Sequence, residues 1–154
     1  MILKKKYVGI DDTMKHIKKQ IIDSVDYCLI NIPAMEDPRE LFYYLKNIVT
    51  YKNDPKNIEL LQTAQTLIEN NFHDIPGAGD CDCFTILTVA AMISQNWDNI
   101  YIDLVGRSKS SPVHIYSHII WNGKRQVLDL TNKQFNQERP YPFKQEIKVN
   151  WRKW

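Results

Sequence analysis

The sequence GDCDCFTILTVAAMISQNW occupies residues 79–97, and from Cys83 to Trp97 it contains no charged side chain. Its apolar residues leave no polar face at helical spacing, which is typical of a helix buried on most sides. A loop that contains Gly79 leads into this segment, and Cys81 stands where the loop ends. The stretch therefore predicts a central helix with a cysteine at its start.

Three further helices are predicted in the first half of the chain, where apolar residues recur every three or four positions. Residues 11–12 are aspartates that can cap the first helix, and Ile32-Pro33 ends it. Asp37-Pro38 predicts a second start, with a capping residue followed by proline at the first helical position. Asp54-Pro55 repeats this pattern, so a third helix is expected over residues 58–68.

After the central helix the apolar period becomes two, which predicts strands over residues 100–105, 113–121 and 125–131. Asn122-Gly123 is a favoured two-residue hairpin turn, because both residue types tolerate positive φ. Residues 146–151 are expected to add an edge strand. Helices followed by an antiparallel sheet of three to four strands predict an α+β fold.

The size and composition of the chain are those of one globular domain. It has 154 residues, of which 44% are hydrophobic and 25% are charged. The net charge of +2 argues against a dedicated nucleic-acid-binding protein. The basic residues near the two ends are interpreted as solvated termini.

Cysteine usage predicts a reducing compartment. The three cysteines, Cys28, Cys81 and Cys83, cannot all pair within one chain, and two of them are separated by a single residue. The sequence contains no apolar run of signal-peptide or membrane-span length. A cytoplasmic protein without membrane contact is therefore expected.

Cys81 has the setting of a nucleophile. The first turn of a helix supplies the positive end of the helix dipole and free N–H groups, which stabilise a thiolate and can bind an oxyanion. Asp80 and Asp82 act in the opposite direction, because negative charge beside a thiolate raises the pKa of the cysteine. A working nucleophile here therefore needs a histidine partner.

The hairpin brings histidines near an aspartate. With a two-residue turn, paired positions sum to 245, so Asp129 lies opposite Tyr116 and diagonal to both His114 and His118. An aspartate held against an imidazole fixes its tautomer and stabilises its protonated form. The pairing predicts a Cys–His–Asp arrangement but does not choose between the two histidines.

Together, the segments Gly79-Asp80-Cys81-Asp82, His114-Ile115-Tyr116 and Val127-Leu128-Asp129-Leu130-Thr131 resemble the transglutaminase-like superfamily of papain-related folds. The closer likeness is to small transglutaminase-like proteins of tailed phages and prophages, which the segment from Tyr51 to Gln62 also resembles. The resemblance implies one transglutaminase-like domain over residues 1–154. It comprises a helical N-terminal extension (1–47), a catalytic core (48–132) and a C-terminal segment (133–154).

By position, the resemblance implies that Cys81 is the nucleophile, His114 the base and Asp129 the residue that orients it. Cys83 replaces the second acidic residue of the family motif, and Leu130 stands where the family often has proline. The implied activity is attack on a peptide, isopeptide or carboxamide carbonyl through a thioester, with no cofactor. Hydrolysis of protease or amidase type is expected rather than transamidation, because the chain lacks the length of the large cross-linking enzymes.

Two other interpretations remain open from the sequence. One is a metal site built from Cys81, Cys83 and histidine, although Cys-x-Cys is not the usual zinc spacing. The other is a non-catalytic module that keeps the fold, such as a component of a phage virion, its assembly or a host contact. The expected partners are thus a peptide or protein substrate or phage structural proteins, and not nucleic acid.

Overall fold

The computed structural model describes residues 2–6, 9–56, 58–69 and 75–154. In chain order these residues form the following elements: β1 (Ile2–Lys6), α1 (Ile10–Asn31), α2 (Pro38–Lys46), β2 (Thr50–Tyr51), β3 (Ile58–Gln62), α3 (Ala64–Glu69), β4 (Ala78–Gly79), α4 (Cys81–Ser94), β5 (Ile100–Gly106), β6 (Pro112–Trp121), β7 (Lys124–Leu128), β8 (Phe143–Lys148) and the 3₁₀ turn η1 (Trp151–Lys153).

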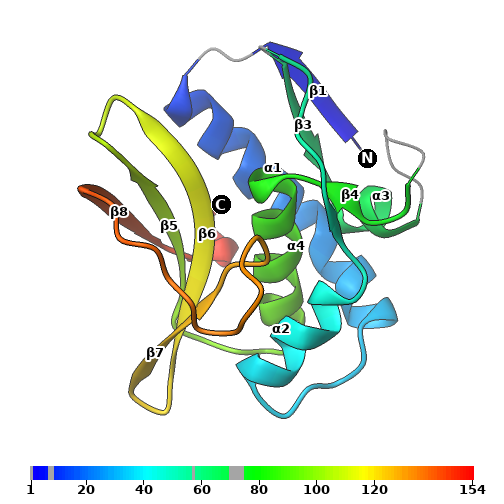
Figure 1. The fold of residues 1–154 in the computed structure, drawn as a ribbon. Coiled ribbons are helices and arrows are strands. Elements are labelled where there is room, and N and C mark those ends of the chain that lie inside the picture. The colour runs from blue at the N-terminus through cyan, green and yellow to red at the C-terminus, as the bar shows by residue number, and fades with distance from the viewer. Residues whose placement is uncertain (1, 7–8, 57, 70–74) are drawn as a thin grey trace.

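The second half of the chain forms one antiparallel sheet with the strand order β7-β6-β5-β8. α4 lies in the middle of the molecule, between this sheet and α1 (Figure 1). Helices and an antiparallel four-stranded sheet make this an α+β fold, as the sequence predicts. No helix in the described ranges is both long and apolar enough to cross a membrane.

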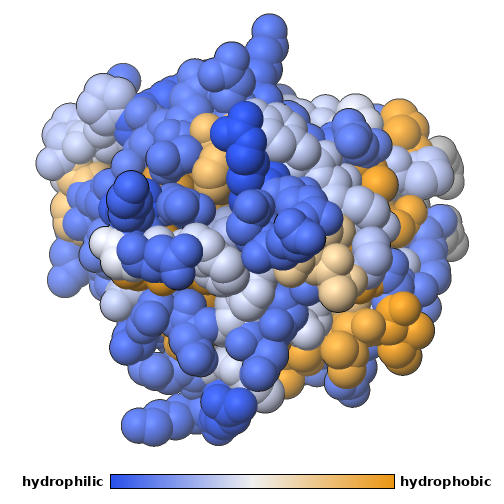
Figure 2. Space-filling view, turned by 90° about the horizontal axis from the view of Figure 1, so that it is seen from below, coloured by the Kyte–Doolittle hydropathy of each residue, from blue (hydrophilic) through white to orange (hydrophobic). Residues whose placement is uncertain are grey.

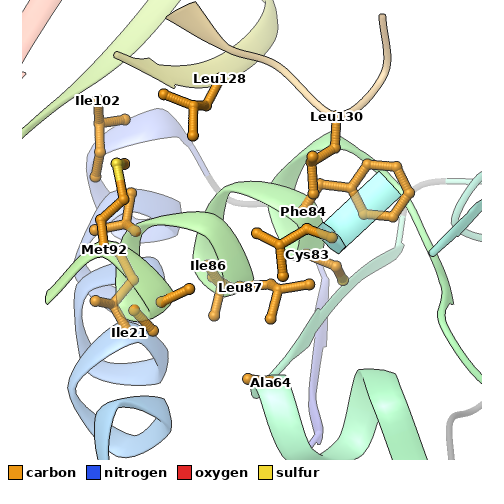
Figure 3. Close-up of a cluster of buried hydrophobic side chains, with 14 of the residues drawn as sticks. Ile21, Ala64, Cys83, Phe84, Ile86, Leu87, Met92, Ile102, Leu128 and Leu130 are labelled. Atoms are coloured by element: carbon orange, nitrogen blue, oxygen red, sulfur yellow. The ribbon is translucent and has the colours of Figure 1, made fainter. Parts of the chain in front are cut away.

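α4 is buried nearly all round. Every residue from Cys83 to Ile93 is buried, because helices cover one side and the sheet covers the other. Figure 3 shows Leu87 and Met92 of α4 among side chains from distant elements, including Ile21 of α1 and Ile102 of β5. The absence of charge in this segment is therefore explained by its place in the core.

The hairpin of β6 and β7 has the expected register. Asn122 and Gly123 adopt φ values of 52° and 78°, and Ser117 pairs with Leu128. β7 ends at Leu128, so the prediction of a strand through residue 131 is wrong at its end. Asp129 instead begins a turn, because its own side chain accepts the N–H of a residue two positions later.

The helix predicted over residues 58–68 is also wrong in its first half. Ile58–Gln62 is strand β3, which pairs with β1 in antiparallel register, and only Ala64–Glu69 is helical. Asp54 does not cap a helix here; its Oδ2 accepts the Leu60 N–H at 2.9 Å. The pairing partner lies more than fifty residues away in the sequence, beyond the reach of a local pattern. Lys4, Lys5 and Lys6, near the start of the sequence, belong to strand β1.

The start of α2 agrees with the sequence prediction, whereas the start of α1 does not. Asp37 caps α2 by accepting the Glu40 N–H at 2.8 Å, with Pro38 at the first helical position, which confirms that prediction. α1 starts earlier than expected, after Gly9, and has no side-chain cap. Asp11 and Asp12 lie in its first turn, where their negative charges interact favourably with the helix dipole. The sequence also predicts a loop over residues 70–79; residues 70–74 lie outside the described ranges, and Ala78–Gly79 form strand β4 instead.

Candidate active site

Cys81 is the first residue of α4. Asp80 caps the helix: its Oδ1 accepts the N–H groups of Asp82 at 3.2 Å and Cys83 at 3.5 Å. The short strand β4 ends immediately before this cap, at Gly79, which packs against Cys83 so closely that a Cβ there would lie 2.9 Å from the Cys83 Cβ. The backbone on both sides of Cys81 is therefore held in place.

Cys81 and His114 line the same cavity, of about 210 Å³, which we call the cysteine cavity. α4 supplies Cys81 and Asp82, and the start of β6 supplies Pro112 to Ile115. Ile10, Thr13, Glu59 and Leu104 complete its wall. Thiol nucleophilic catalysis requires a thiol and a base in one cavity, and Cys81 and His114 both line this one.

His114 is held by Asp129. The distance between His114 Nε2 and Asp129 Oδ2 is 2.7 Å, and the side chains are 15% and 7% exposed. Because Nε2 faces the carboxylate, Nδ1 is the ring nitrogen that remains to exchange a proton with a thiol. The structure thus joins Asp129 to His114, one of the two histidines that the register left open.

The other oxygen of Asp129 is also fixed. Oδ1 accepts the Thr131 N–H at 3.0 Å and the Thr131 hydroxyl at 2.7 Å, while Asn132 Nδ2 lies 3.4 Å from Oδ2. Asp129 therefore forms an Asx turn with one oxygen and orients the imidazole with the other. Thr131 and Asn132 were not predicted from the sequence, and their closeness to Asp129 was the only available signal.

The surroundings of Cys81 favour the thiol over the thiolate. Burial raises the pKa of Cys81 well above its ordinary value, and the negative charges of Asp82 and then Asp80 raise it further. A hydrogen bond from the Ile115 backbone lowers the same pKa, by a smaller amount. A thiolate on Cys81 would therefore have to form by transfer of the thiol proton to a base.

The two aspartates beside Cys81 are themselves perturbed. Burial raises the pKa of both Asp80 and Asp82, and repulsion from Asp54 adds to the effect on each pKa. A carboxyl whose pKa is raised carries less than a full negative charge at neutral pH. The repulsion that the thiolate meets is smaller than two full charges would produce.

Comparison of the sequence with protein-family models and with curated proteins finds no match. Among solved structures, the chain is similar to a crystal structure of a TGase, with a TM-score of 0.37 and 12% sequence identity. The match covers 88% of this chain and 37% of that chain, so this chain spans about a third of its length. The roles considered below rest on the side chains of this chain.

His118 belongs to a different cluster. It is 2% exposed, and its Nδ1 lies 2.6 Å from Oδ2 of Asp103, which is fully buried. Arg125 Nη2 lies 3.3 Å from the same oxygen, and the ring of Tyr101 stacks on the imidazole at 4.7 Å. The sequence contained a signal for this cluster, since Asp103 is a lone acidic residue in an otherwise apolar strand.

Cys83 points away from the site. It is fully buried, and its Sγ lies 3.0 Å from the Leu60 carbonyl and 3.7 Å from Nε2 of Gln62. That amide also donates to the Ala78 carbonyl at 3.0 Å, so Gln62 is engaged behind the helix. Cys83 is thus a packed thiol, while Cys81 is only partly buried by its exposed area.

Two groups in the described part of the chain bring three metal-ligating side chains together, and neither includes a cysteine. The first is Asp103, His118 and Glu146, where the guanidinium of Arg125 already supplies a positive charge. The second is the cluster of Asp54, Asp80 and Asp82. The metal site that the sequence left open, with Cys81 and Cys83 as ligands, is not among these groups. Cys83 Sγ contacts Leu60 and Gln62, whereas Cys81 lines the cysteine cavity.

Two further cavities adjoin the cysteine cavity. One, of about 300 Å³, shares Val113 and His114 with it and is lined by Tyr51, Arg139 and Tyr141. The other, of about 730 Å³, shares Ile10 and Leu104 with it. The cysteine cavity therefore shares lining residues with two larger cavities.

Proposed function

We propose that the protein is a cysteine-dependent hydrolase of transglutaminase-like type, with Cys81 as nucleophile, His114 as base and Asp129 as the residue that orients His114. The observation that carries the proposal is the 2.7 Å contact between His114 Nε2 and Asp129 Oδ2 beside the cavity that holds Cys81. The substrate is a peptide, isopeptide or carboxamide bond.

In the proposed first step, His114 Nδ1 takes the thiol proton as Cys81 Sγ attacks the carbonyl carbon. Asp129 stabilises the imidazolium that forms. The C–N bond then breaks, the leaving amine takes the proton from His114, and a thioester remains on Cys81. Water, deprotonated by the same imidazole, attacks the thioester and releases a carboxylic acid and the free thiol.

The oxyanion needs hydrogen-bond donors that are not already engaged. The N–H groups of Asp82 and Cys83 donate to the Asp80 cap, so the helix start offers fewer free donors than the sequence led us to expect. The Cys81 N–H is the first backbone donor of the helix and has no partner among the described hydrogen bonds. We assign it as one oxyanion donor.

The test combines labelling with turnover. Iodoacetamide followed by intact-mass measurement should modify one site, because Cys28 and Cys83 are fully buried in the folded protein. Cys81→Ala should lose both this label and any hydrolysis of a peptide library, while Cys83→Ala keeps both. Normal hydrolysis in Cys81→Ala, or unchanged hydrolysis in His114→Ala, would overturn the proposal.

A second candidate function is a non-catalytic interaction module of the kind found in virions. The observation in its favour is exposed apolar surface at the end of α1, where Leu29 and Ile30 are 63% and 81% exposed. Figure 2 shows a mainly hydrophilic face with hydrophobic side chains gathered along one side. If Leu29→Ser with Ile30→Ser abolishes a partner contact while Cys81→Ala leaves the biological role intact, this second function is correct.

A further inference from the structure

A cavity of about 730 Å³ forms a groove between α1 and the sheet edge formed by β5 and β8. Four lysines line it: Lys15, Lys18, Lys19 and Lys109. We call it the lysine groove. The catalytic mechanism proposed above does not use this groove. Ile10 and Leu104 line both the groove and the cysteine cavity.

The lysine groove is electropositive. Its four lysines face two aspartates, Asp11 and Asp23, and the latter is already paired with Lys19 at 2.6 Å. Among the described ion pairs, none involves Lys15, Lys18 or Lys109. Lys18 Nζ instead lies 5.4 Å from the ring centroid of Trp154. The positive charge of the groove is therefore available to an anionic ligand.

The floor of the lysine groove is apolar. Met14 and Leu104 belong to the core, and Ile147 and Trp154 pack against it. A groove that binds only phosphate would not need this apolar surface. A peptide in which acidic and apolar side chains alternate could pair with the lysines and pack on the apolar floor. The ligand chemistry is thus acidic and apolar at once.

The third observation is the sheet edge. β8 ends the sheet, its partner in the described sheet being β5, and Gln145 and Ile147 of β8 line the groove. An unpaired strand edge offers backbone N–H and C=O groups to an extended peptide, and alternate side chains of that peptide would then face the groove. This favours a polypeptide over a lipid or a nucleic acid.

We propose that the lysine groove binds an acidic, extended segment of a polypeptide substrate and leads it to Cys81. This inference rests on the proposed hydrolase for its substrate role but not for binding. The acidic residues of the segment would lie away from the reacting bond, because the cysteine cavity itself contains Asp82 and Glu59. Because the lysine groove is basic and the cysteine cavity is acidic, acidic residues of the peptide should be preferred on only one side of the reacting bond.

The first experiment measures binding without turnover. Short fluorescein-labelled peptides of alternating Glu and Leu, Gln and Leu, or Lys and Leu are titrated against Cys81→Ala protein, with fluorescence anisotropy as the readout. The Glu-Leu peptide should bind at least about tenfold more tightly than the other two, and its affinity should fall as salt is raised. Equal binding of all three peptides would overturn the inference.

Charge reversal locates the binding. Lys15→Glu with Lys109→Glu changes two exposed lysines on opposite walls of the groove and should weaken Glu-Leu binding by about tenfold. The matched control, Lys124→Glu with Lys133→Glu, changes two exposed lysines that line none of the cavities described here and should bind as before. Equal loss in both variants would show non-specific attraction and defeat the proposal.

Two further probes separate the remaining ligands and the two proposals. A labelled single-stranded oligonucleotide, or vesicles of anionic lipid, that bind more tightly than the Glu-Leu peptide would overturn the choice of a polypeptide. Peptide binding without any hydrolysis by the wild-type protein would defeat the hydrolase and leave the groove assignment standing. Hydrolysis with no acidic preference would defeat only the groove assignment.

Discussion

At Cys81 two opposing effects act on one sulfur atom. The start of α4 offers a favourable dipole, yet its N–H groups at Asp82 and Cys83 are occupied by the Asp80 carboxylate. Burial and the two neighbouring aspartates raise the pKa of the thiol. The dipole alone contributes about 1 kcal/mol at an exposed site, so burial and repulsion prevail. We therefore expect proton transfer during attack in place of a stable ion pair with His114.

Asp82→Asn should lower the pKa of Cys81, because it removes the largest of the nearby charges that raise it. The rate of iodoacetamide labelling of Cys81, followed against pH by intact mass, should rise at a pH lower by about one unit than in the wild type. Asp98→Asn, at an exposed position after α4, serves as the matched control and should leave the profile unchanged. An unshifted profile in Asp82→Asn would show that the carboxylate does not act on the thiol.

Among the elements, β6 carries both histidines on one face with different partners. His114 stands at the start of the strand, partly exposed beside Asp129, whereas His118 lies in the middle, buried against Asp103. The position along β6 thus leaves His114 accessible to a ligand and buries His118 in the sheet.

Substitution of the two histidines should separate these roles. His118→Ala leaves the buried Asp103 carboxylate without one of its partners and should lower the free energy of unfolding by about 1–3 kcal/mol, measured by urea denaturation. His114→Ala should lower it by less than about 1 kcal/mol while hydrolysis is lost. A stable His118→Ala protein that has lost hydrolysis would reverse the two assignments.

The junction between β4 and α4 permits little change. A Cβ at Gly79 would lie 2.9 Å from both the Cys83 Cβ and the Leu67 Cδ1. Gly79→Ala should therefore lower the free energy of unfolding by about 1–3 kcal/mol and slow the labelling of Cys81, because the helix start has to shift. Gly9→Ala is the control, since a Cβ there would contact nothing within 4 Å. Equal stability of the two variants would contradict this prediction.

For the whole molecule, one ion-pair network connects three strands of the sheet with the segment that follows β7. Glu138 binds Tyr116 of β6, Arg125 of β7 and Lys144 of β8. Burial alone would raise the pKa of Glu138, but the hydrogen bonds from Arg125, Lys144 and Tyr116 outweigh it and lower the pKa to about 2. A carboxylate with a lowered pKa stabilises the folded state above its ordinary titration range.

This network should contribute to acid stability. The contribution of Glu138 is complete above its ordinary pKa of 4.5 and is lost as the pH falls toward about 2. Glu138→Gln should therefore reduce stability at neutral pH and flatten the acid limb of the unfolding curve. The change should stay below about 1 kcal/mol, since the side chain is partly exposed and solvent screens its ion pairs. Thermal unfolding at several pH values measures it, and an acid limb as steep as in the wild type would contradict it.

Elements that depend on local signals could be predicted from the sequence, whereas an element that depends on a distant partner could not. The hairpin register and the buried α4 follow from Asn122-Gly123 and from the uncharged stretch after Cys83, which are local signals. β3 was mistaken for a helix because its apolar residues fit either period, and only pairing with the distant β1 decides between them.

The sequence by itself determined the buried central helix, the cysteine at its start and the register that brings Asp129 near two histidines. Only the tertiary structure decided that Asp129 binds His114, that His118 is buried with Asp103, and that burial and nearby carboxylates raise the pKa of Cys81. Turns and periodicity act through neighbouring residues, so a sequence displays them. Burial, charge and the choice of hydrogen-bond partner depend on residues that meet only when the sheet packs on α4.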